Sequence, residues 1–554
     1  ASPVKSGVGE KWQKKCEFGA SLATSTLIIT SQRMEFNAGG YVPDTAPRAC
    51  AICKRRKKKC DKKLPRCSSC TMHNTTCEYS DQEVLNLADD LRNLQKWLRK
   101  VETSLFTAPE GSRSPESLLS MDSSSALSKP AFNIPAPSVA VWQTQNERLT
   151  NSNIDESLSN QVYRLMEMGH HDINEISMMY FENVHKWFPI ISKKLFYNTL
   201  SDLQTHPKAD FSLLLLVIYL LIRSPSEDSS IQDMQDTFYM TAKYICTCVQ
   251  MFLPPSKYLV QAMLLLATFE HASGNCEAAY LTIGECIRNA YLMKLHLPKN
   301  TDAPRGSDEW LAAVEARNLW WGIVIRERYI VLEEEIHDRP LATKIPSNDF
   351  KLPVEIDDLD MLEGEIEKKF PPYEGVGDDI GTFGREAQAC CILDAVIGFS
   401  GESHFATPER QTELMAMDSR IRGFFSYLMD EAKGTWGKYC GATTMILASF
   451  FTLHQNQIAF EKATLRQDDS STSEISKYAL RSAVRIVMVV SDHFNANISR
   501  FNMMAIPPTY TYIIYRAAMS IIMLGDEVDS EQLVNDFQNL RRTCWYMSHR
   551  WEIA

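Results

Sequence analysis

From residue 151 to the end of the chain, apolar positions recur at a spacing close to 3.6 residues, the repeat of a helix that is buried along one side. Segments with this spacing cover Leu213–Ile222, Lys257–Glu270, Ala278–Leu295, Glu309–Leu332, Thr443–Lys462, Ile475–Asn495 and Tyr510–Leu524. Prolines at positions 189, 254–255, 298, 340, 371–372 and 507–508 punctuate these segments, as is typical of turns between helices. The pattern predicts one large all-α domain over residues 151–554. Two domains, divided in the acidic, proline-bearing stretch 346–380, are the alternative.

A stricter pattern occupies residues 84–105, where apolar residues fall at alternating steps of three and four. They are Val84, Leu87, Leu91, Leu94, Leu98, Val101 and Leu105. This spacing is the a/d seam of a coiled coil over three heptads. A helix this short is marginal alone, so the seam needs a partner. We predict a linker and dimerisation helix over 80–106 that pairs with a second copy of the chain. An amphipathic helix packed on the same chain is the alternative.

Two segments lack any periodic pattern. Residues 107–150 are rich in Ser, Pro and Ala, and we expect a disordered linker there. Residues 1–46 are expected to be a disordered leader. Met34 begins a short, plausible leader of its own, so we hypothesise that residues 1–33 are a gene-model extension or a fragment end.

The composition fits a mainly α-helical protein. The chain has 554 residues, of which 44% are hydrophobic, which is enough to fill a sizeable core and excludes wholesale disorder. Its 23 glycines and 24 prolines make up about 8% of the residues, against about 12% in average usage. No apolar run approaches the ~18–20 residues that span a bilayer. We therefore expect no membrane partner, and an intracellular chain because the N-terminus lacks the pattern of a secretory signal.

Charge is distributed very unevenly. The stretch 47–77 contains ten Lys or Arg residues and one acid, Asp61, so it carries +9 while the whole chain carries −11. The rest of the chain therefore carries −20. A compact basic segment on an acidic body indicates a polyanion-binding module attached to a domain that does not bind polyanions.

The same basic stretch holds six cysteines in two matching C-x2-C-x6-C halves. They are Cys50, Cys53, Cys60, Cys67, Cys70 and Cys77. Zinc takes four ligands and binds thiolate well, so two separate ions would need eight sulfurs. Six suffice if two sulfurs bridge both ions, and the symmetry of the halves selects Cys50 and Cys67 as the bridges. We predict a module over residues 47–79 that holds two Zn(II) ions, which supply folding free energy because so short a segment has almost no hydrophobic core.

Every residue between the second and third cysteines is basic. These residues are Lys54, Arg55, Arg56, Lys57, Lys58 and Lys59. Lys and Arg neutralise phosphates, and a few of them can contact the O6 and N7 acceptors of guanine. We therefore predict binding to double-stranded DNA with G-rich half-sites. A nuclear-import signal is the alternative for such a run, and the two roles can coexist.

Ala49–Tyr79 resembles the DNA-binding domain of the fungal zinc binuclear cluster transcription factors. The cysteine spacing, the basic run, Asp61 after the third cysteine and Pro65 two residues before the fourth all match that family. The resemblance implies that two zincs share the first and fourth cysteines. It also implies that Lys57, with Arg56 beside it, reads a CGG triplet, and that the seam forms a parallel homodimer.

Part of the helical remainder resembles the fungal-specific transcription factor regulatory domain, also called the middle homology region. The matching segments are Tyr180–Ile191, Gln261–His296 and the signature Trp320–Trp321, Glu327–Arg328 and Arg339–Pro340. The two tryptophans are interpreted as core residues, and the Glu-Arg pair as structural rather than catalytic. The remaining cysteines lack zinc spacing and are expected to be small apolar residues in helices. The resemblance implies that the domain gates activity through a small molecule or a corepressor, and a coactivator is a further expected partner.

These features predict a nuclear, sequence-specific regulator of RNA polymerase II transcription, and not an enzyme. The chain contains no G-x-S-x-G, phosphate loop, dinucleotide fingerprint or H-E-x-x-H motif. The alternatives are an enzyme or a protein-interaction factor that carries an accessory zinc module. RNA binding is disfavoured because RNA readers stack bases on aromatic rings, and residues 48–77 contain none.

Overall fold

The computed structural model describes residues 53, 56, 58–63, 66–73, 149–168, 172–223, 229–299, 303–304, 306–333, 339–347, 349–355, 380–401, 408–432, 437–464, 471–524 and 530–551. The chain divides into two compact units, residues 1–131 and 132–554. The expected leader, the heptad seam and nearly all of the serine-rich linker lie outside the described residues.

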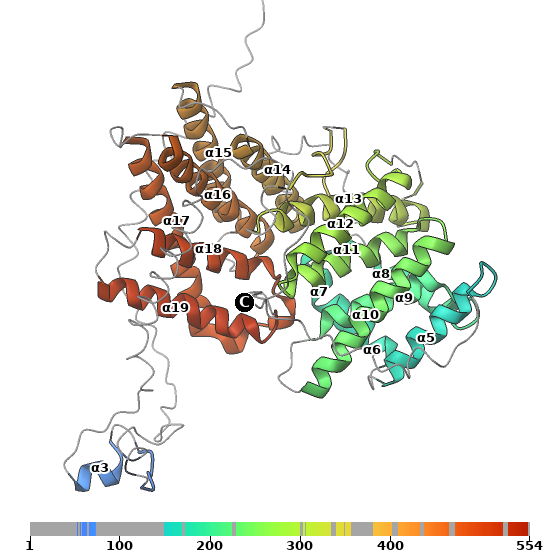
Figure 1. Ribbon diagram of the computed structural model, residues 1–554, viewed down its shortest axis with the longest axis horizontal. Coiled ribbons are helices and arrows are strands. Elements are labelled where there is room, and N and C mark those ends of the chain that lie inside the picture. The colour runs from blue at the N-terminus through green and yellow to red at the C-terminus, as the bar shows by residue number, and fades with distance from the viewer. Residues whose placement is uncertain are drawn as a thin grey trace, which may run out of the picture. The chain divides into compact units, whose positions relative to one another are not determined.

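The described part of the larger unit consists of α-helices and two short 3-10 helices (Figure 1). Its first half contains α5 (Ile154–Met168), α6 (Ile173–Glu182), α7 (Val184–Trp187), α8 (Lys193–Asp202), α9 (Ala209–Ile222), α10 (Ser229–Phe252), α11 (Lys257–Ala272), α12 (Cys276–Leu292) and α13 (Asp308–Ile330). Its second half contains α14 (Thr382–Gly401), α15 (Pro408–Ala432), α16 (Cys440–Thr464), α17 (Ser471–Asn497), η2 (Ile498–Arg500), η3 (Met503–Ala505), α18 (Thr509–Leu524) and α19 (Ser530–Ser548).

Helix α9 is the central helix of the first half. Its side chains from Phe211 to Ile222 are all buried because α5, α6, α10 and α11 pack around it. A helix that is apolar on every side needs such a cover. Its first turn is capped by a residue that is far away in the sequence. The Ala209 N–H donates to the Asp155 carboxylate of α5 over 2.8 Å. No helix in the described part of the chain is long and apolar enough to cross a bilayer.

Helices α11 and α12 form a tight hairpin that packs on α13. Gly274 adopts a left-handed backbone with φ +72° directly after α11, a conformation that suits glycine. The Asn275 side chain then caps α12 by accepting from the Ala278 N–H over 3.2 Å. The residue that ends α11 and the residue that begins α12 are therefore adjacent in the sequence, at Gly274 and Asn275.

Both tryptophans of the α13 signature are buried, at 2% and 0% exposure. The Trp321 indole N–H donates to the Lys351 carbonyl over 2.9 Å, and the Trp320 ring meets the Tyr291 ring of α12 edge-on. These contacts agree with their interpretation as core residues.

The Glu-Arg pair of the signature connects the two sides of the stretch 356–379, which lies outside the described residues. Arg328 is fully buried and donates to Glu327 and to Asp394 of α14, each over 2.8 Å. The Glu327 carboxylate also accepts from the backbone N–H groups of Ala342 and Thr343. A buried charge needs such partners. The pair is structural, as interpreted from the sequence.

The predicted fold class, mainly α, is confirmed. Each helical segment expected from the apolar spacing corresponds to a helix, with ends that differ by a few residues. The apolar run Leu213–Ile222, for example, is the C-terminal part of α9, which begins earlier at Ala209. Helices α13 and α14 pack together, and so do α14 and α16, so residues 132–554 are described as one compact unit.

Candidate zinc centre and nucleic-acid interface

The described cysteines of the small unit form its core. Cys53, Cys67 and Cys70 are buried at 2%, 0% and 1% exposure, and partly buried Cys60 packs against them. The Sγ atoms of Cys53, Cys67 and Cys70 lie within 4.8 Å of one another, and those of Cys53 and Cys67 are 3.7 Å apart. Two chain segments are thus held together by sulfur atoms rather than by larger apolar side chains.

The separation of the Cys53 and Cys67 sulfurs is that of two ligands on one tetrahedral zinc. A Zn–S bond of about 2.3 Å places two tetrahedral ligands roughly 3.8 Å apart. The Cys67 Sγ also lies within 4.8 Å of ligand atoms of Cys60 and Asp61, so it belongs to both groups of neighbouring donors. That position suits a bridging thiolate. Cys50 and Cys77, the other bridge and the last ligand predicted, lie outside the described residues.

The second C-x2-C pair is positioned by a short helix, α3 (Ser68–Met72). Cys67 precedes this helix, and its Sγ accepts from the Cys70 N–H over 3.4 Å. Asp61 accepts from both the backbone N–H and the hydroxyl of Ser68. These bonds, above all that of the Ser68 hydroxyl, hold the pKa of the Asp61 carboxyl below its ordinary value. The sequence matched Asp61 to a family pattern, but only the structure shows that it ties the third cysteine to the second half.

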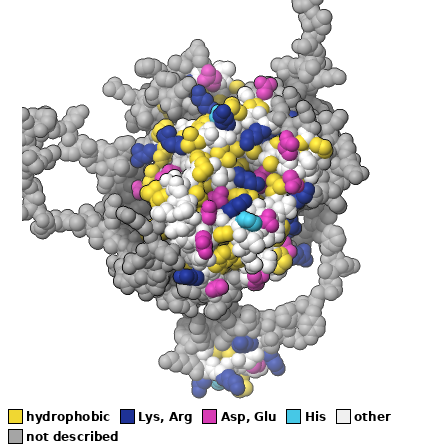
Figure 2. All heavy atoms as spheres, turned by 90° about the vertical axis from the view of Figure 1, so that its right-hand side faces the viewer, with side chains coloured by type: hydrophobic (Ala, Val, Ile, Leu, Met, Phe, Trp, Pro, Cys, Tyr) yellow, Lys and Arg dark blue, Asp and Glu magenta, His cyan; other side chains and the backbone are white. Residues whose placement is uncertain are grey.

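The described basic side chains of the module are exposed. Arg56, Lys58 and Lys59 all face solvent, and the Lys58 N–H donates to the Cys53 carbonyl over 3.0 Å, which anchors the run beside the cysteine cluster. Figure 2 shows Lys and Arg side chains on the surface of the described residues of this unit. Lys54, Arg55 and Lys57 lie outside the described residues.

The structure adds Lys63 and Arg66 to the exposed cations of the module. The predicted DNA-contacting set did not include them, because it was confined to the uninterrupted run. The signal that could have found them is the net charge of +9 over the whole stretch. An exposed cationic surface of this kind suits a phosphate backbone.

The cysteines of the larger unit have the properties expected of small apolar residues. Burial raises the pKa of the Cys286 and Cys390 thiols well above the ordinary value, and that of Cys246 to about 12. They therefore remain protonated at neutral pH. Within the described residues, clusters of three or more potential metal ligands occur only in the small unit.

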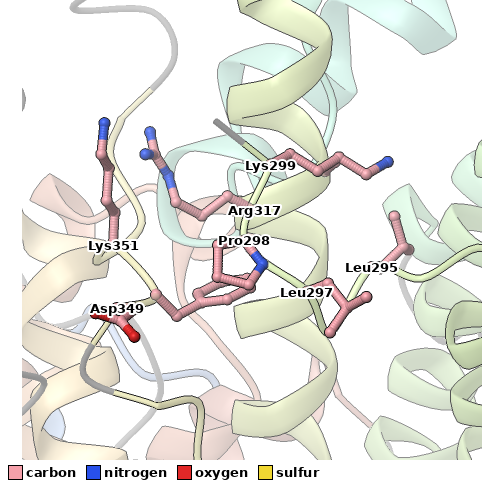
Figure 3. A pocket seen from close by; sticks show the side chains of 9 residues that line it. Leu295, Leu297, Pro298, Lys299, Arg317, Asp349 and Lys351 are labelled. Atoms are coloured by element: carbon pink, nitrogen blue, oxygen red, sulfur yellow. The ribbon is translucent and has the colours of Figure 1, made fainter. Parts of the chain in front are cut away.

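A small pocket beside α13 has a cationic rim (Figure 3). Lys299, Arg317 and Lys351 line it together with Asp349 and Phe350, and burial lowers the pKa of Arg317 to about 10. Its free volume of about 10 Å³ is close to that of one water molecule. The pocket is therefore too small to hold an organic ligand.

Comparison with protein families matches both units. Residues 48–84 match the fungal Zn(2)-Cys(6) binuclear cluster domain, and residues 178–380 match the fungal specific transcription factor domain. Transcription factor BOA15 of Botryotinia fuckeliana (strain B05.10) is 33% identical over 134 residues, which cover 24% of this chain and 72% of BOA15. The chain belongs to the fungal zinc binuclear cluster transcription factors. The resemblance seen in the sequence is confirmed.

Longer alignments to other members of the family are weaker. The depudecin biosynthesis cluster-specific transcription activator DEP6 of Fusarium langsethiae is 25% identical over 364 residues, covering 53% of this chain and 58% of DEP6. The citrinin biosynthesis transcriptional activator mrl3 of Monascus ruber is 22% identical over 335 residues, covering 55% of this chain and 64% of mrl3. This chain therefore spans between half and two thirds of the length of these relatives.

Family membership sets the chemistry of the small unit. The binuclear cluster domain binds two zinc ions, as predicted from the cysteine spacing, and the sulfur geometry fits them. The family is one of DNA-binding transcription factors, and its members are not named as enzymes. Nothing supports the alternative of an enzyme or interaction factor with an accessory zinc module.

Proposed function

We propose that this zinc cluster protein is a nuclear, sequence-specific regulator of RNA polymerase II transcription that reads CGG-type half-sites as a homodimer. One observation carries the proposal. The buried sulfur cluster lies directly beneath a run of exposed cations, and one backbone hydrogen bond, from Lys58 to Cys53, connects the two. The metal centre thus presents the basic run to a duplex.

In this proposal all six cysteines hold the two ions, with Cys50 and Cys67 bridging them. When bound, the ions supply the cross-links that keep a short, core-poor segment folded. The exposed Arg56, Lys58 and Lys59 neutralise phosphates, which positions the module on the duplex without reading sequence. Lys57, with Arg56 beside it, reads the guanines of the triplet in the major groove.

The heptad seam supplies the dimer. Two seams in parallel place two cysteine modules on two half-sites, and the connector Glu78–Glu83 limits how far apart these can lie, since six residues reach at most about 20 Å. We expect the double change Leu91→Lys and Leu98→Lys to abolish cooperative binding to a paired site, because four lysines would face each other in the seam.

The matched control for the seam is Asn93→Lys with Thr103→Lys, which adds the same charge off the apolar stripe. Gel-shift titration on paired and single half-sites measures the effect, and zinc content measured by mass spectrometry should be two ions per chain in both variants. Equal paired-site affinity for the seam variant and its control would show that the seam is not the dimer interface.

The names of the relatives support a role in regulating a biosynthetic gene cluster. DEP6, mrl3 and the pigment regulator pigB of Monascus ruber are each named as activators of a biosynthesis. We propose that this chain likewise activates clustered biosynthetic genes. Its helical unit then receives the coactivator, corepressor or small molecule that sets activity.

The deciding experiment is selection of DNA sites from a random library with the zinc-loaded full chain at one stated salt concentration. We expect enrichment of paired CGG triplets at one fixed spacing, and no enrichment with Cys67→Ser. A lone triplet would indicate a monomeric reader. Absence of enrichment by a chain that holds two zincs would refute sequence-specific DNA binding.

A further inference from the structure

The second half of the helical unit contains a cavity of about 240 Å³. Helices α15, α16, α17 and α18 and the turn before α16 line it. Most of its wall is apolar, including Leu447, Val487, Ile513 and Ile514, all of which are buried. A cavity of about 150 Å³ in another protein is large enough to admit benzene. This one has room for a larger ring system.

Two buried hydroxyl oxygens, on residues that line the cavity, have no hydrogen-bond partner among the described residues. They are the hydroxyl oxygens of Ser491 on α17 and Tyr510 on α18, whose residues are 0% and 8% exposed. Buried polar groups almost always have a partner, because an unmade hydrogen bond carries the full cost of desolvation. Neither oxygen presents surface to a water-sized probe, so a molecule in the cavity pairs with one of them only after the Ser491 or Tyr510 side chain rotates toward it.

The cavity wall is uncharged in its interior. Burial raises the pKa of the Cys440 thiol to about 12 and that of the Tyr510 phenol well above its ordinary value, so both groups stay protonated. Lys438 is the charged lining residue. It is exposed, and its Nζ lies 4.9 Å from the centroid of the ring of buried Tyr439.

Another lining residue, Thr444, has a hydroxyl with partners in the protein. It donates to the Gly441 carbonyl over 2.9 Å and lies 2.9 Å from the Tyr329 hydroxyl of α13. Ser491 and Tyr510 differ from Thr444 in that their hydroxyls have no such partner. They lie on two different helices, α17 and α18.

We propose that this cavity binds a small, uncharged, largely apolar molecule of one or two rings that carries a hydroxyl or carbonyl oxygen. The apolar body fills the space among α15–α18, and the oxygen pairs with the hydroxyl of Ser491 or of Tyr510 once that side chain rotates toward the cavity. The site lies beyond residues 178–380 that match the regulatory family model. Binding is measured without DNA, so its failure is distinguishable from a failure of DNA recognition.

The test uses 2-naphthol as the probe, titrated into the zinc-loaded full chain near neutral pH and followed by ligand-observed NMR. A ligand of this size that fits well is expected to bind with a dissociation constant on the order of 0.1 mM. Naphthalene, which lacks the hydroxyl, should bind about 2- to 10-fold more weakly. The anion 2-naphthoate should bind about 100-fold more weakly, since the interior offers its charge no partner. Absence of 2-naphthol binding, or equal binding of all three probes, would overturn the proposal.

A matched pair of variants locates the site. Val490 lines the cavity, whereas its neighbour Val489 on α17 is 68% exposed and does not. Val490→Phe fills the cavity and should abolish probe binding, while Val489→Phe adds the same ring to the surface and should leave it unchanged. Equal affinity of the two variants would place the probe elsewhere.

If Val490→Phe fails to fold, two further variants test the proposed hydrogen bonds to the ligand. Ser491→Ala and Tyr510→Phe remove one hydroxyl each with little change in volume. Each should reduce the preference for 2-naphthol over naphthalene while leaving naphthalene affinity unchanged. An unchanged preference in both variants would show that these hydroxyls do not contact the probe.

Discussion

At the scale of single residues, Cys67 combines two tasks. Its sulfur belongs to both groups of neighbouring donors, and it also accepts the Cys70 N–H at the start of α3. The metal site and the local helix are therefore positioned by the same atom. Substitution of Cys67 should therefore impair zinc binding more than substitution of a cysteine outside the module.

We predict that Cys67→Ser lowers the zinc content from two ions per chain to fewer than one and abolishes DNA binding, because a bridging ligand contacts both ions. Elemental mass spectrometry and gel-shift titration measure the two effects. The control is Cys544→Ser in α19, where the cysteine is half-buried and outside the module. A Cys67 variant that retained two zincs would rule out the bridging role.

Among the described acids of the helical unit, Glu386 has a carboxyl pKa that is raised far above its ordinary value. It is nearly buried on α14, and burial raises the pKa of its carboxyl to about 7, opposed by the nearby Arg326 guanidinium. The carboxylate lies against the backbone of Gly441 at the start of α16, and a Cβ at that glycine would be 2.4 Å from Glu386 Oε2. Burial, and after it the nearby Glu386 carboxylate, raises the pKa of Tyr329 and of Cys440.

The raised pKa predicts a pH dependence of stability. The folded chain holds the Glu386 proton more tightly than the unfolded chain, so this stabilisation is complete below about pH 4.5 and is lost as pH rises through about 7. Glu386→Gln should remove that dependence. From pH 5 to pH 8, its free energy of unfolding should gain about 2 kcal/mol relative to the unsubstituted chain. Denaturant titrations at several pH values measure it, and parallel curves for the two proteins would contradict the raised pKa.

At the scale of elements, α13 is a helix that packs against helices of both halves of the larger unit. Its neighbours are α8, α11, α12 and α14. At Gly322, side chains of buried neighbours lie close to the backbone of α13. A Cβ at Gly322 would lie 2.8 Å from Ile190 Cγ2 and 3.3 Å from Leu264 Cδ2. The absence of a side chain there is what lets two buried neighbours touch the helix backbone.

We predict that Gly322→Ala destabilises the fold by about 1–2 kcal/mol, because overpacking outweighs the better helix propensity of alanine. The control is Gly423→Ala in α15, where an added Cβ meets nothing within 4 Å. That change should stabilise by about 0.5–1 kcal/mol. Thermal and denaturant unfolding measure the change in the free energy of unfolding for both variants. A stabilising effect of Gly322→Ala would contradict the prediction and mean that the neighbouring side chains move aside.

At the scale of the whole molecule, the cysteine module and the rest of the chain carry opposite charge. The module 47–77 carries +9 and the rest of the chain −20. Nucleic acid is therefore attracted to one part of the chain and repelled by the other. This division confines non-specific DNA binding to the module that also reads sequence.

We expect DNA affinity to fall steeply with salt, and Lys58→Gln to make the slope of log affinity against log salt shallower by about one. The loss should be the same for specific and random DNA, since a phosphate contact carries no sequence information. Lys186→Gln on α7, which is equally exposed but lies on the acidic unit, is the control and should leave the slope unchanged. A sequence-dependent loss for Lys58 would instead assign it to a base edge.

The sequence by itself determined the zinc chemistry, the basic surface and the helical fold class. Each rests on local spacing: C-x2-C places two thiolates on one ion, and a repeat of 3.6 residues places apolar side chains on one helix face. The helix α9 was found in this way from the run Leu213–Ile222, although its start was not, because the cap at Ala209 comes from Asp155 on another helix.

Only the tertiary structure decided which distant residues meet. Arg328 pairs with Asp394, which lies 66 positions later in the chain, and Ser491 and Tyr510 line one cavity from different helices. Neither residue type nor spacing marks them, since serine and tyrosine on a helix usually have partners or face solvent. Local spacing specifies the elements, whereas the packing of one helix on another decides which polar groups are paired and which are left for a ligand.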